Sequence, residues 1–219
     1  MKKRMLLLVA LVIAGALLAV YGPTLLGFYR LQRHIDATAQ ADDADGGPWP
    51  RVTDMCMGCH GVKGTSLNDA YPSLAGQPAH YVAAQLHAFA SGQRANPTMG
   101  PLAMTMSEAE IARVAGYYAK QAPLDNRYFT PDARLRAKGE QLVTGGACVA
   151  CHGARLTGQA QFPRLAGQGY VYLRAQLDAF ANGTRIEATG TMQRVAQAMS
   201  ADDRVAVATY LASLRPVKQ

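Results

Sequence analysis

The chain has 219 residues and a formal net charge of +7, with 49% hydrophobic and 17% charged side chains. This composition excludes a disordered, highly charged tail protein. A basic balance suggests nucleic-acid binding. However, five of the basic residues fall within the first 35 residues, which contain no Asp or Glu, and the rest of the chain carries only +2. We therefore expect no nucleic-acid partner.

Residues 1–35 are predicted to form a membrane anchor. Residues 5–29 contain no charged side chain, and about 20 apolar residues suffice for a helix to cross a bilayer. A cleavable signal peptide has a shorter apolar core, of about 7–15 residues, followed closely by a cleavage site between small residues. Here the apolar run is longer, and the small-residue pattern at 37–39 lies beyond Arg30 and Arg33. The sequence therefore favours a retained anchor over a signal peptide.

The charges around this segment indicate its orientation. Lys2, Lys3 and Arg4 precede the apolar run, and basic residues favour the cytoplasmic side of a membrane. We expect a single-pass protein with its N-terminus inside and the rest of the chain outside. Residues 36–49, rich in Ala, Asp, Gly and Pro, are expected to form a flexible linker.

All four cysteines belong to one pattern that occurs twice, Cys-Met-Gly-Cys-His at 56–60 and Cys-Val-Ala-Cys-His at 148–152. Cys-x-x-Cys-His is the attachment motif of c-type haem: the thiols bond to the haem vinyl groups, and the His supplies an axial nitrogen to the iron. A zinc site would need four ligands from separated pairs, a thioredoxin motif does not need the His, and structural disulfides are a third alternative. The repetition favours two covalently attached haem c groups, on Cys56, Cys59 and His60 and on Cys148, Cys151 and His152.

The second half of the chain repeats the first. Residues 72–94 match residues 163–185 at 14 of 23 positions, including Leu-Ala-Gly-Gln, Ala-Gln-Leu and Ala-Phe-Ala. Each half has fewer than 100 residues, which suits a small domain packed around a haem. We expect two domains, at 50–125 and 126–219, after the anchor and the linker.

Helical patterns occur in both halves, and no segment shows the alternation of a strand. Ser107 with Glu110 forms a capping-box signature, and Ser200 with Asp203 a weaker version. The expected class is all-α, with helices at 79–91, 107–120, 132–144, 170–182 and 200–214.

Methionines offer a second ligand for each iron, because a Met sulfur closes the open face of the haem and favours electron transfer. A shift of 93 residues pairs Met99 with Met192 and also Met106 with Met199. The second pair directly precedes the cap serines, where an apolar side chain packs against the helix. We favour Met99 and Met192, which are expected in loops.

Arg94 and Arg185 also occupy equivalent positions in the repeat. A guanidinium matches a carboxylate well, so both side chains are candidates for contacts with the haem propionates. The alternative is that each is a solvated arginine at a helix end.

The chain resembles the cytochrome c4 family, in which two class I cytochrome c domains follow one another. The resemblance covers roughly residues 50–216. It rests on the two haem motifs, on Tyr-Pro-Ser-Leu-Ala-Gly-Gln and Phe-Pro-Arg-Leu-Ala-Gly-Gln, on the Gln-Leu-x-Ala-Phe-x-x-Gly-x-Arg helices, and on a Met eight residues before the Ser of each last helix.

The resemblance implies His60 with Met99 on one iron and His152 with Met192 on the other. It also implies that the carbonyls of Pro72 and Pro163 orient the histidine rings. One departure concerns residues 46–50, Gly-Gly-Pro-Trp-Pro, where the family has a helix. Two prolines shorten any helix there, so the opening helix of the first domain is in question.

The expected function is therefore electron transport in a bacterial respiratory chain. The protein would lie in the inner membrane with its haem domains in the periplasm. A quinol–cytochrome c reductase or a dehydrogenase would be its donor, and a terminal oxidase its acceptor. The first alternative is a cytochrome subunit of a periplasmic dehydrogenase or oxidase complex. The second is a dihaem peroxidase, which would need one iron without a permanent sixth ligand; here both halves supply a Met.

Overall fold

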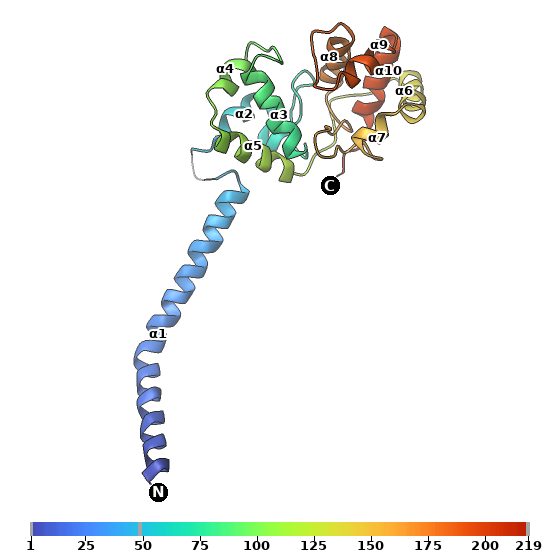
Figure 1. Ribbon diagram of the computed structural model, residues 1–219. Helices are drawn as coiled ribbons and strands as arrows, with labels where there is room; N and C mark the ends of the chain where they lie inside the picture. The colour runs from blue at the N-terminus through green and yellow to red at the C-terminus, as the bar shows by residue number, and fades with distance from the viewer. Residues whose placement is uncertain (1, 48–49, 218–219) are drawn as a thin grey trace. The chain divides into compact units, whose positions relative to one another are not determined.

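The computed structural model describes residues 2–47 and 50–217, and the chain divides into two compact units, Met1–Trp49 and Pro50–Gln219. The first unit is dominated by a single helix, α1 (Lys2–Ala44), of 43 residues. The second unit contains the remaining helices in two halves that follow the sequence repeat (Figure 1).

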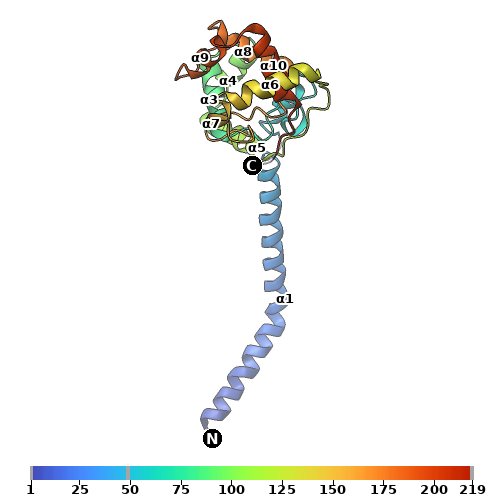
Figure 2. The ribbon, with the colours of Figure 1, turned by 90° about the vertical axis from the view of Figure 1, so that its right-hand side faces the viewer.

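Helix α1 is long and apolar enough to cross a membrane, with a mean hydropathy of 2.6 over its most apolar 18 residues. A signal sequence near the N-terminus of a protein shares these properties. The helix bends near its middle (Figure 2). Pro23 lies inside it, and a proline removes one backbone hydrogen bond and kinks a helix.

The helix also continues further than the sequence suggested. We expected a flexible linker from residue 36, but residues 36–44 are helical and a turn follows at 45–47. The alanines at 37, 39, 41 and 44 account for the difference, because Ala has the highest helix propensity of all residues. The end of the expected linker, residues 48–49, lies outside the described residues.

The second unit is all-α, as predicted, and the part of it that the structure describes has one isolated bridge, between Gln159 and Phe162, and no strand. The first half contains α2 (Asp54–His60), the 3-10 turn η1 (Val62–Gly64), α3 (Ala79–Ala90), α4 (Met99–Met104) and α5 (Glu108–Lys120). The second half contains α6 (Ala133–Gly145), α7 (Cys148–His152), α8 (Tyr170–Ala181), α9 (Thr191–Gln197) and α10 (Ala201–Ser213).

The five helices predicted from the sequence are present as α3, α5, α6, α8 and α10, and no end differs by more than one residue. Both capping boxes are also present. The Ser107 side chain accepts from the N–H of Glu110, whose carboxylate accepts from the N–H of Ser107; Ser200 and Asp203 repeat this exchange. Asp132 caps α6 by accepting from two backbone N–H groups.

Each half has its own apolar core, and the two cores differ in how their last helix is covered. Helix α10 is buried along the whole of Ala206–Ala212, because α8 packs on one side and α6 on the other. Helix α5 buries only Ile111, Val114, Ala115 and Tyr118.

The difference arises because the described residues of the first half contain no counterpart of α6. Between residues 45 and 53, the described residues form turns and bends rather than a helix. The sequence there contains Pro48 and Pro50, and a proline inside a helix removes a backbone hydrogen bond and clashes with the preceding turn. The helix that the family pattern would place here is therefore absent from the described residues.

Gly139 allows α6 and α10 to cross closely. A Cβ atom at this position would collide with the carbonyl oxygen of Ala206 and lie 2.7 Å from Cβ of Tyr210. Gly116, on α5, has open space around it instead, with nothing within 4 Å of such an atom.

Gly139→Ala is predicted to lower the free energy of unfolding by about 3 kcal/mol, because the backbones of α6 and α10 would have to separate. Gly116→Ala is the matched control and should raise it by about 0.5–1 kcal/mol, since alanine is the better helix former. Thermal and denaturant unfolding of the haem-loaded protein measure both. Equal effects of the two substitutions would contradict the close crossing.

Candidate haem-binding sites

The two Cys-x-x-Cys-His motifs lie on short helices, α2 and α7. Residues three apart on a helix share a face, so Cys56 and Cys59 project from one side of α2, and Cys148 and Cys151 from one side of α7. All four cysteines are free thiols, which argues against structural disulfides. Among the described residues, no group of three or more His, Cys, Asp or Glu side chains is arranged to hold a metal ion.

Burial raises the pKa of the Cys56 and Cys148 thiols above the ordinary value. Both thiols are therefore protonated at neutral pH. In the haem-loaded protein these thiols would hold the group through thioether bonds to its vinyl groups.

Each motif histidine is held by a carbonyl from the same half of the chain. Nδ1 of His60 lies 2.8 Å from the Pro72 oxygen, and Nδ1 of His152 lies 2.9 Å from the Pro163 oxygen. A carbonyl can only accept, so Nδ1 carries the proton in both rings and Nε2 keeps its lone pair. The structure thus brings together the pairs that the resemblance indicated.

The protonation state of these rings suits a metal ligand. Burial lowers the pKa of His60 and of His152, and the proline carbonyl opposes this only in part. Both imidazoles are therefore neutral at pH 7, which is the form that binds iron. Free thiols, a neutral imidazole and an available Nε2 in each half fit the covalent attachment of one haem.

The backbone after each motif turns sharply. Gly61 and Gly153 follow the histidines with φ of 75° and 85°, values that favour glycine. At Gly61 a Cβ atom would also collide with the carbonyl oxygen of Thr65. These turns start the loops that return to Pro72 and Pro163 and carry the carbonyls back to the histidines.

Met99 and Met192 lie at helix starts rather than in loops, contrary to our expectation. Met99 is the first residue of α4, and Met192 is the second residue of α9. Side chains upstream form local turns that begin these helices: Oδ1 of Asn96 accepts from the Met99 N–H at 2.8 Å, and Oε1 of Glu187 accepts from the Met192 N–H at 3.1 Å. Both methionines are half-buried against the cores of their own halves.

Met106 and Met199 are half-buried against the same cores. Each directly precedes the cap serine of its last helix, α5 or α10. This is the packing position that the sequence suggested for that pair.

Arg94 and Arg185 take part in one cluster that joins the two halves of the second unit. Arg94 donates to Tyr172 at 3.0 Å and to Gln176 at 2.9 Å, across the interface. Arg185 donates in return to Tyr81 at 3.2 Å and to Gln85 at 3.0 Å. Each arginine therefore donates to a tyrosine and a glutamine of the other half.

These arginines are not solvated side chains at helix ends, which was the alternative that the sequence left open. Each guanidinium lies over a phenylalanine ring of its own half, at 4.6 Å for Arg94 and 4.5 Å for Arg185, and both are part-buried. Their hydrogen-bond partners are tyrosines and glutamines. The positive charges of the two guanidinium groups therefore lie close together, and none of these contacts includes a carboxylate. These partners also repeat in the sequence, Tyr81 with Tyr172 and Gln85 with Gln176, so the repeat carries a signal for the cluster.

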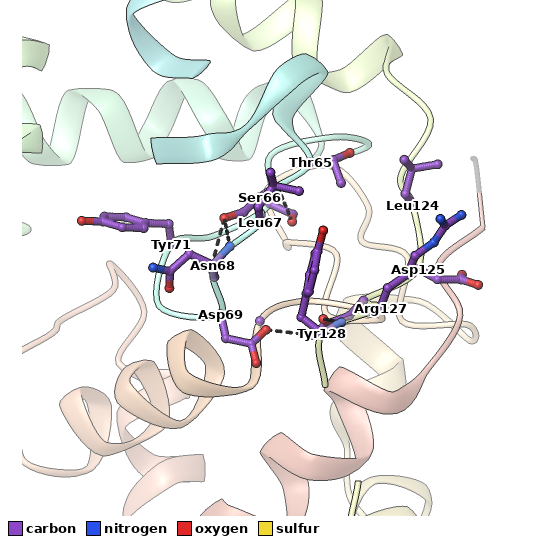
Figure 3. Close-up of a pocket in the computed structure, with 14 residues that line it drawn as sticks. Thr65, Ser66, Leu67, Asn68, Asp69, Tyr71, Leu124, Asp125, Arg127 and Tyr128 are labelled. Carbon is purple, nitrogen blue, oxygen red and sulfur yellow. Dashed lines mark hydrogen bonds between the residues drawn. The ribbon is translucent and has the colours of Figure 1, made fainter. Parts of the chain in front are cut away.

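A hollow of about 170 Å³ lies where the loop 65–73 meets the connection between the two halves (Figure 3). The Asn126 amide donates to the Asp69 carboxylate there at 3.0 Å, and the Asp69 carbonyl accepts from the Tyr172 N–H at 2.9 Å. None of its lining residues belongs to a Cys-x-x-Cys-His motif. The hollow is therefore a gap beside the interdomain connection and not a haem site.

Fold and sites together define a dihaem c-type cytochrome with two class I domains. Family models agree: residues 136–215 match "Cytochrome c", and residues 48–117 match "Cytochrome C oxidase, cbb3-type, subunit III". The chain is 36% identical over 192 residues to cytochrome c4 of Thiocapsa roseopersicina. The match covers 83% of this chain and 97% of that one. The chain belongs to the cytochrome c4 family.

Two further likenesses extend this result. The chain is 38% identical over 181 residues to a "Thiosulfate dehydrogenase electron acceptor" of Thiomonas intermedia, covering 77% of this chain and 83% of that one. The structure of the present chain resembles reduced cytochrome c4 of Pseudomonas stutzeri, with a TM-score of 0.71 and 29% identity. The match covers 81% of this chain and 98% of that one. The protein is an extracytoplasmic electron carrier with two haem c groups, redox protein partners, and an N-terminal helix that is a signal sequence or an anchor.

Replacing Cys56 and Cys59 together by Ser is predicted to reduce the covalent haem content from two groups per chain to one, because the second motif supplies its own thiols. Replacing Cys148 and Cys151 should give the same stoichiometry. Intact mass and the pyridine haemochrome spectrum measure it. A chain that keeps two covalent haems after either double substitution would contradict the assignment.

Proposed function

We propose that α1 is retained as an anchor in the bacterial inner membrane, with its N-terminus in the cytoplasm and the haem domains in the periplasm. The observation that carries this proposal is the helix itself. It has 43 residues and a mean hydropathy of 2.6 over its most apolar window. A typical signal-peptide core is only about 7–15 residues long. Lys2, Lys3 and Arg4 support the orientation.

The anchored protein would carry electrons between membrane complexes of a respiratory chain. We infer that a quinol–cytochrome c reductase or a dehydrogenase supplies the electrons and that a terminal oxidase accepts them. Tethering keeps the carrier in the layer where both partners lie, so encounter does not require diffusion from the bulk periplasm.

Each haem, when bound, supplies one-electron chemistry at its iron. Within the chain, His60 and Met99 would hold one iron, and His152 and Met192 the other. The Pro72 and Pro163 carbonyls keep the Nδ1 proton in place and fix the ring orientation. A methionine on the second face of both haems would exclude small ligands, which favours a carrier over a peroxidase.

Arg94 and Arg185 are proposed to bind haem propionates. Two guanidinium groups that meet at the domain interface, with only neutral partners in their contacts, provide a favourable site for carboxylates. Tyr81 and Tyr172 would add hydroxyl donors at the same place.

A second candidate function is a cytochrome subunit held in a periplasmic dehydrogenase complex. The observation that favours it is the relative from Thiomonas intermedia, described as a thiosulfate dehydrogenase electron acceptor. On this candidate the chain would take electrons from one enzyme in a stable complex rather than from a mobile pool.

Met99→Ala and Met192→Ala are each predicted to remove about half of the methionine–iron charge-transfer band of the oxidised protein and to make one haem high-spin, because one sulfur ligand is lost. Met104→Ala is the control, since this side chain is exposed and has no counterpart in the repeat. Absorption and electron paramagnetic resonance spectra measure the change. An intact band in either of the first two variants would overturn that ligand.

Membranes from cells that produce the full chain distinguish the two functions. We expect the haems to stay with the membrane after an alkaline wash, to be reduced by quinol, and to remain reduced when the terminal oxidase is blocked by cyanide. Reduction by thiosulfate but not by quinol would favour the dehydrogenase subunit. Haem released into the soluble periplasmic fraction, with a shortened N-terminus by mass, would overturn the anchor.

A further inference from the structure

Two glutamines at equivalent positions of the repeat cross the domain interface and bind the opposite backbone. Gln168 accepts from the Ser73 N–H at 2.7 Å and donates to the Ser73 carbonyl at 3.0 Å. Gln77 accepts from the Arg164 N–H at 2.9 Å and donates to the Arg164 carbonyl at 3.0 Å. We call these two paired contacts the amide clasps. Both glutamines are buried, with 3% of Gln77 and 2% of Gln168 exposed.

The residues that the clasps hold lie directly beside the histidine contacts. Ser73 follows Pro72, so the Pro72 carbonyl and the Ser73 N–H belong to one peptide group. That group accepts from Nδ1 of His60 on one side and donates to Gln168 on the other. The Pro163 carbonyl and the Arg164 N–H form the equivalent peptide group, between His152 and Gln77.

We propose that Gln168 and Gln77 are positioning residues that tune the reduction potential of the haem in the opposite domain. Gln168, from the second domain, acts on the haem at His60. Gln77, from the first domain, acts on the haem at His152. This inference rests on the proposed ligand role of the two histidines.

The physical basis is the polarisation of the peptide group. An N–H that donates a hydrogen bond makes the carbonyl of the same peptide group a stronger acceptor, by about 10–30%. A stronger acceptor draws the Nδ1 proton and makes the imidazole a more basic ligand. A more basic ligand stabilises the ferric state, so each clasp lowers the potential of the haem whose histidine it reaches.

Buried charge at the interface acts in a different way. Arg164 is 2% exposed, and its guanidinium donates to the carbonyls of Ala75, Ala166 and Ser73. A positive charge there disfavours the ferric state of any haem nearby, so its influence extends to both domains. Only the clasps predict that the larger effect falls on the haem of the opposite domain.

Gln168→Met and Gln77→Met in the haem-loaded full chain test the proposal, because Met keeps the size of the side chain but removes the amide. Haem methyl resonances, assigned to each haem by nuclear magnetic resonance, are followed through a redox titration. At fixed solution potential, Gln168→Met should raise the ferrous-to-ferric ratio of the haem at His60 about two- to threefold. The haem at His152 should change less. Gln77→Met should reverse this pattern.

Gln121→Met is the matched control. Its amide donates to the Tyr117 carbonyl at 3.1 Å within the first domain and to neither histidine-bound peptide group, so both midpoints should stay unchanged. Equal shifts of the two haems, a shift confined to the haem of the mutated domain, or no shift would each overturn the proposal.

Gln168→Glu and Gln77→Glu keep the test valid if a Met variant fails to fold. A carboxylate is a stronger acceptor than an amide oxygen, so the haem opposite should shift further toward the ferric state than the haem of the same domain. The methionine–iron band distinguishes a failure of the proposed His–Met ligation from a failure of the proposed role of the clasps. If it is lost in the unmodified protein, the proposed ligation fails; if it is intact but the crossed shifts are absent, only the clasps fail.

Discussion

The hydrogen bond between Nδ1 of each motif histidine and a proline carbonyl is the contact on which the rest of the structure depends. It fixes the tautomer and aims Nε2 away from the loop, while burial keeps the imidazole neutral. To make it, the chain must leave the motif through a tight turn and return 11 or 12 residues later. The glycine with positive φ after each histidine and the conformation of the return loop are consequences of this requirement.

The two halves of the repeat share this contact but differ in other parts of their structure. His60 and His152 have nearly the same hydrogen-bond distance, and both last helices keep their capping boxes. The opening helix is not preserved, since α6 covers α10 while α5 has no equivalent cover from the described residues of its own half. A covalent haem would supply much of the apolar contact in such a small domain, which offsets the loss of this helix.

Sequence reasoning succeeded where one local rule decides the outcome. Cap serines, the haem motifs and apolar periodicity are local signals, and they gave the helices, the all-α class and the two haem groups. It failed where composition was ambiguous: Ala-rich residues 36–44 read as a linker but continue α1, and Met99 and Met192 start helices instead of lying in loops. It could not predict the amide clasps, because Gln77 and Gln168 bond to residues 87 and 95 positions away in the chain. No local pattern indicates which distant residues come together.

The interface between the domains is unusually polar for a contact that must persist, with Arg164, Gln77 and Gln168 buried and Arg94 and Arg185 clustered nearby. Burying such groups costs desolvation, which the hydrogen bonds roughly offset, so the gain is defined geometry more than affinity. Affinity is not required here, because the two domains are joined covalently and their effective concentration is already high. The interface can therefore serve mainly to hold two peptide groups in a fixed mutual orientation. Through these groups it also orients the two histidines.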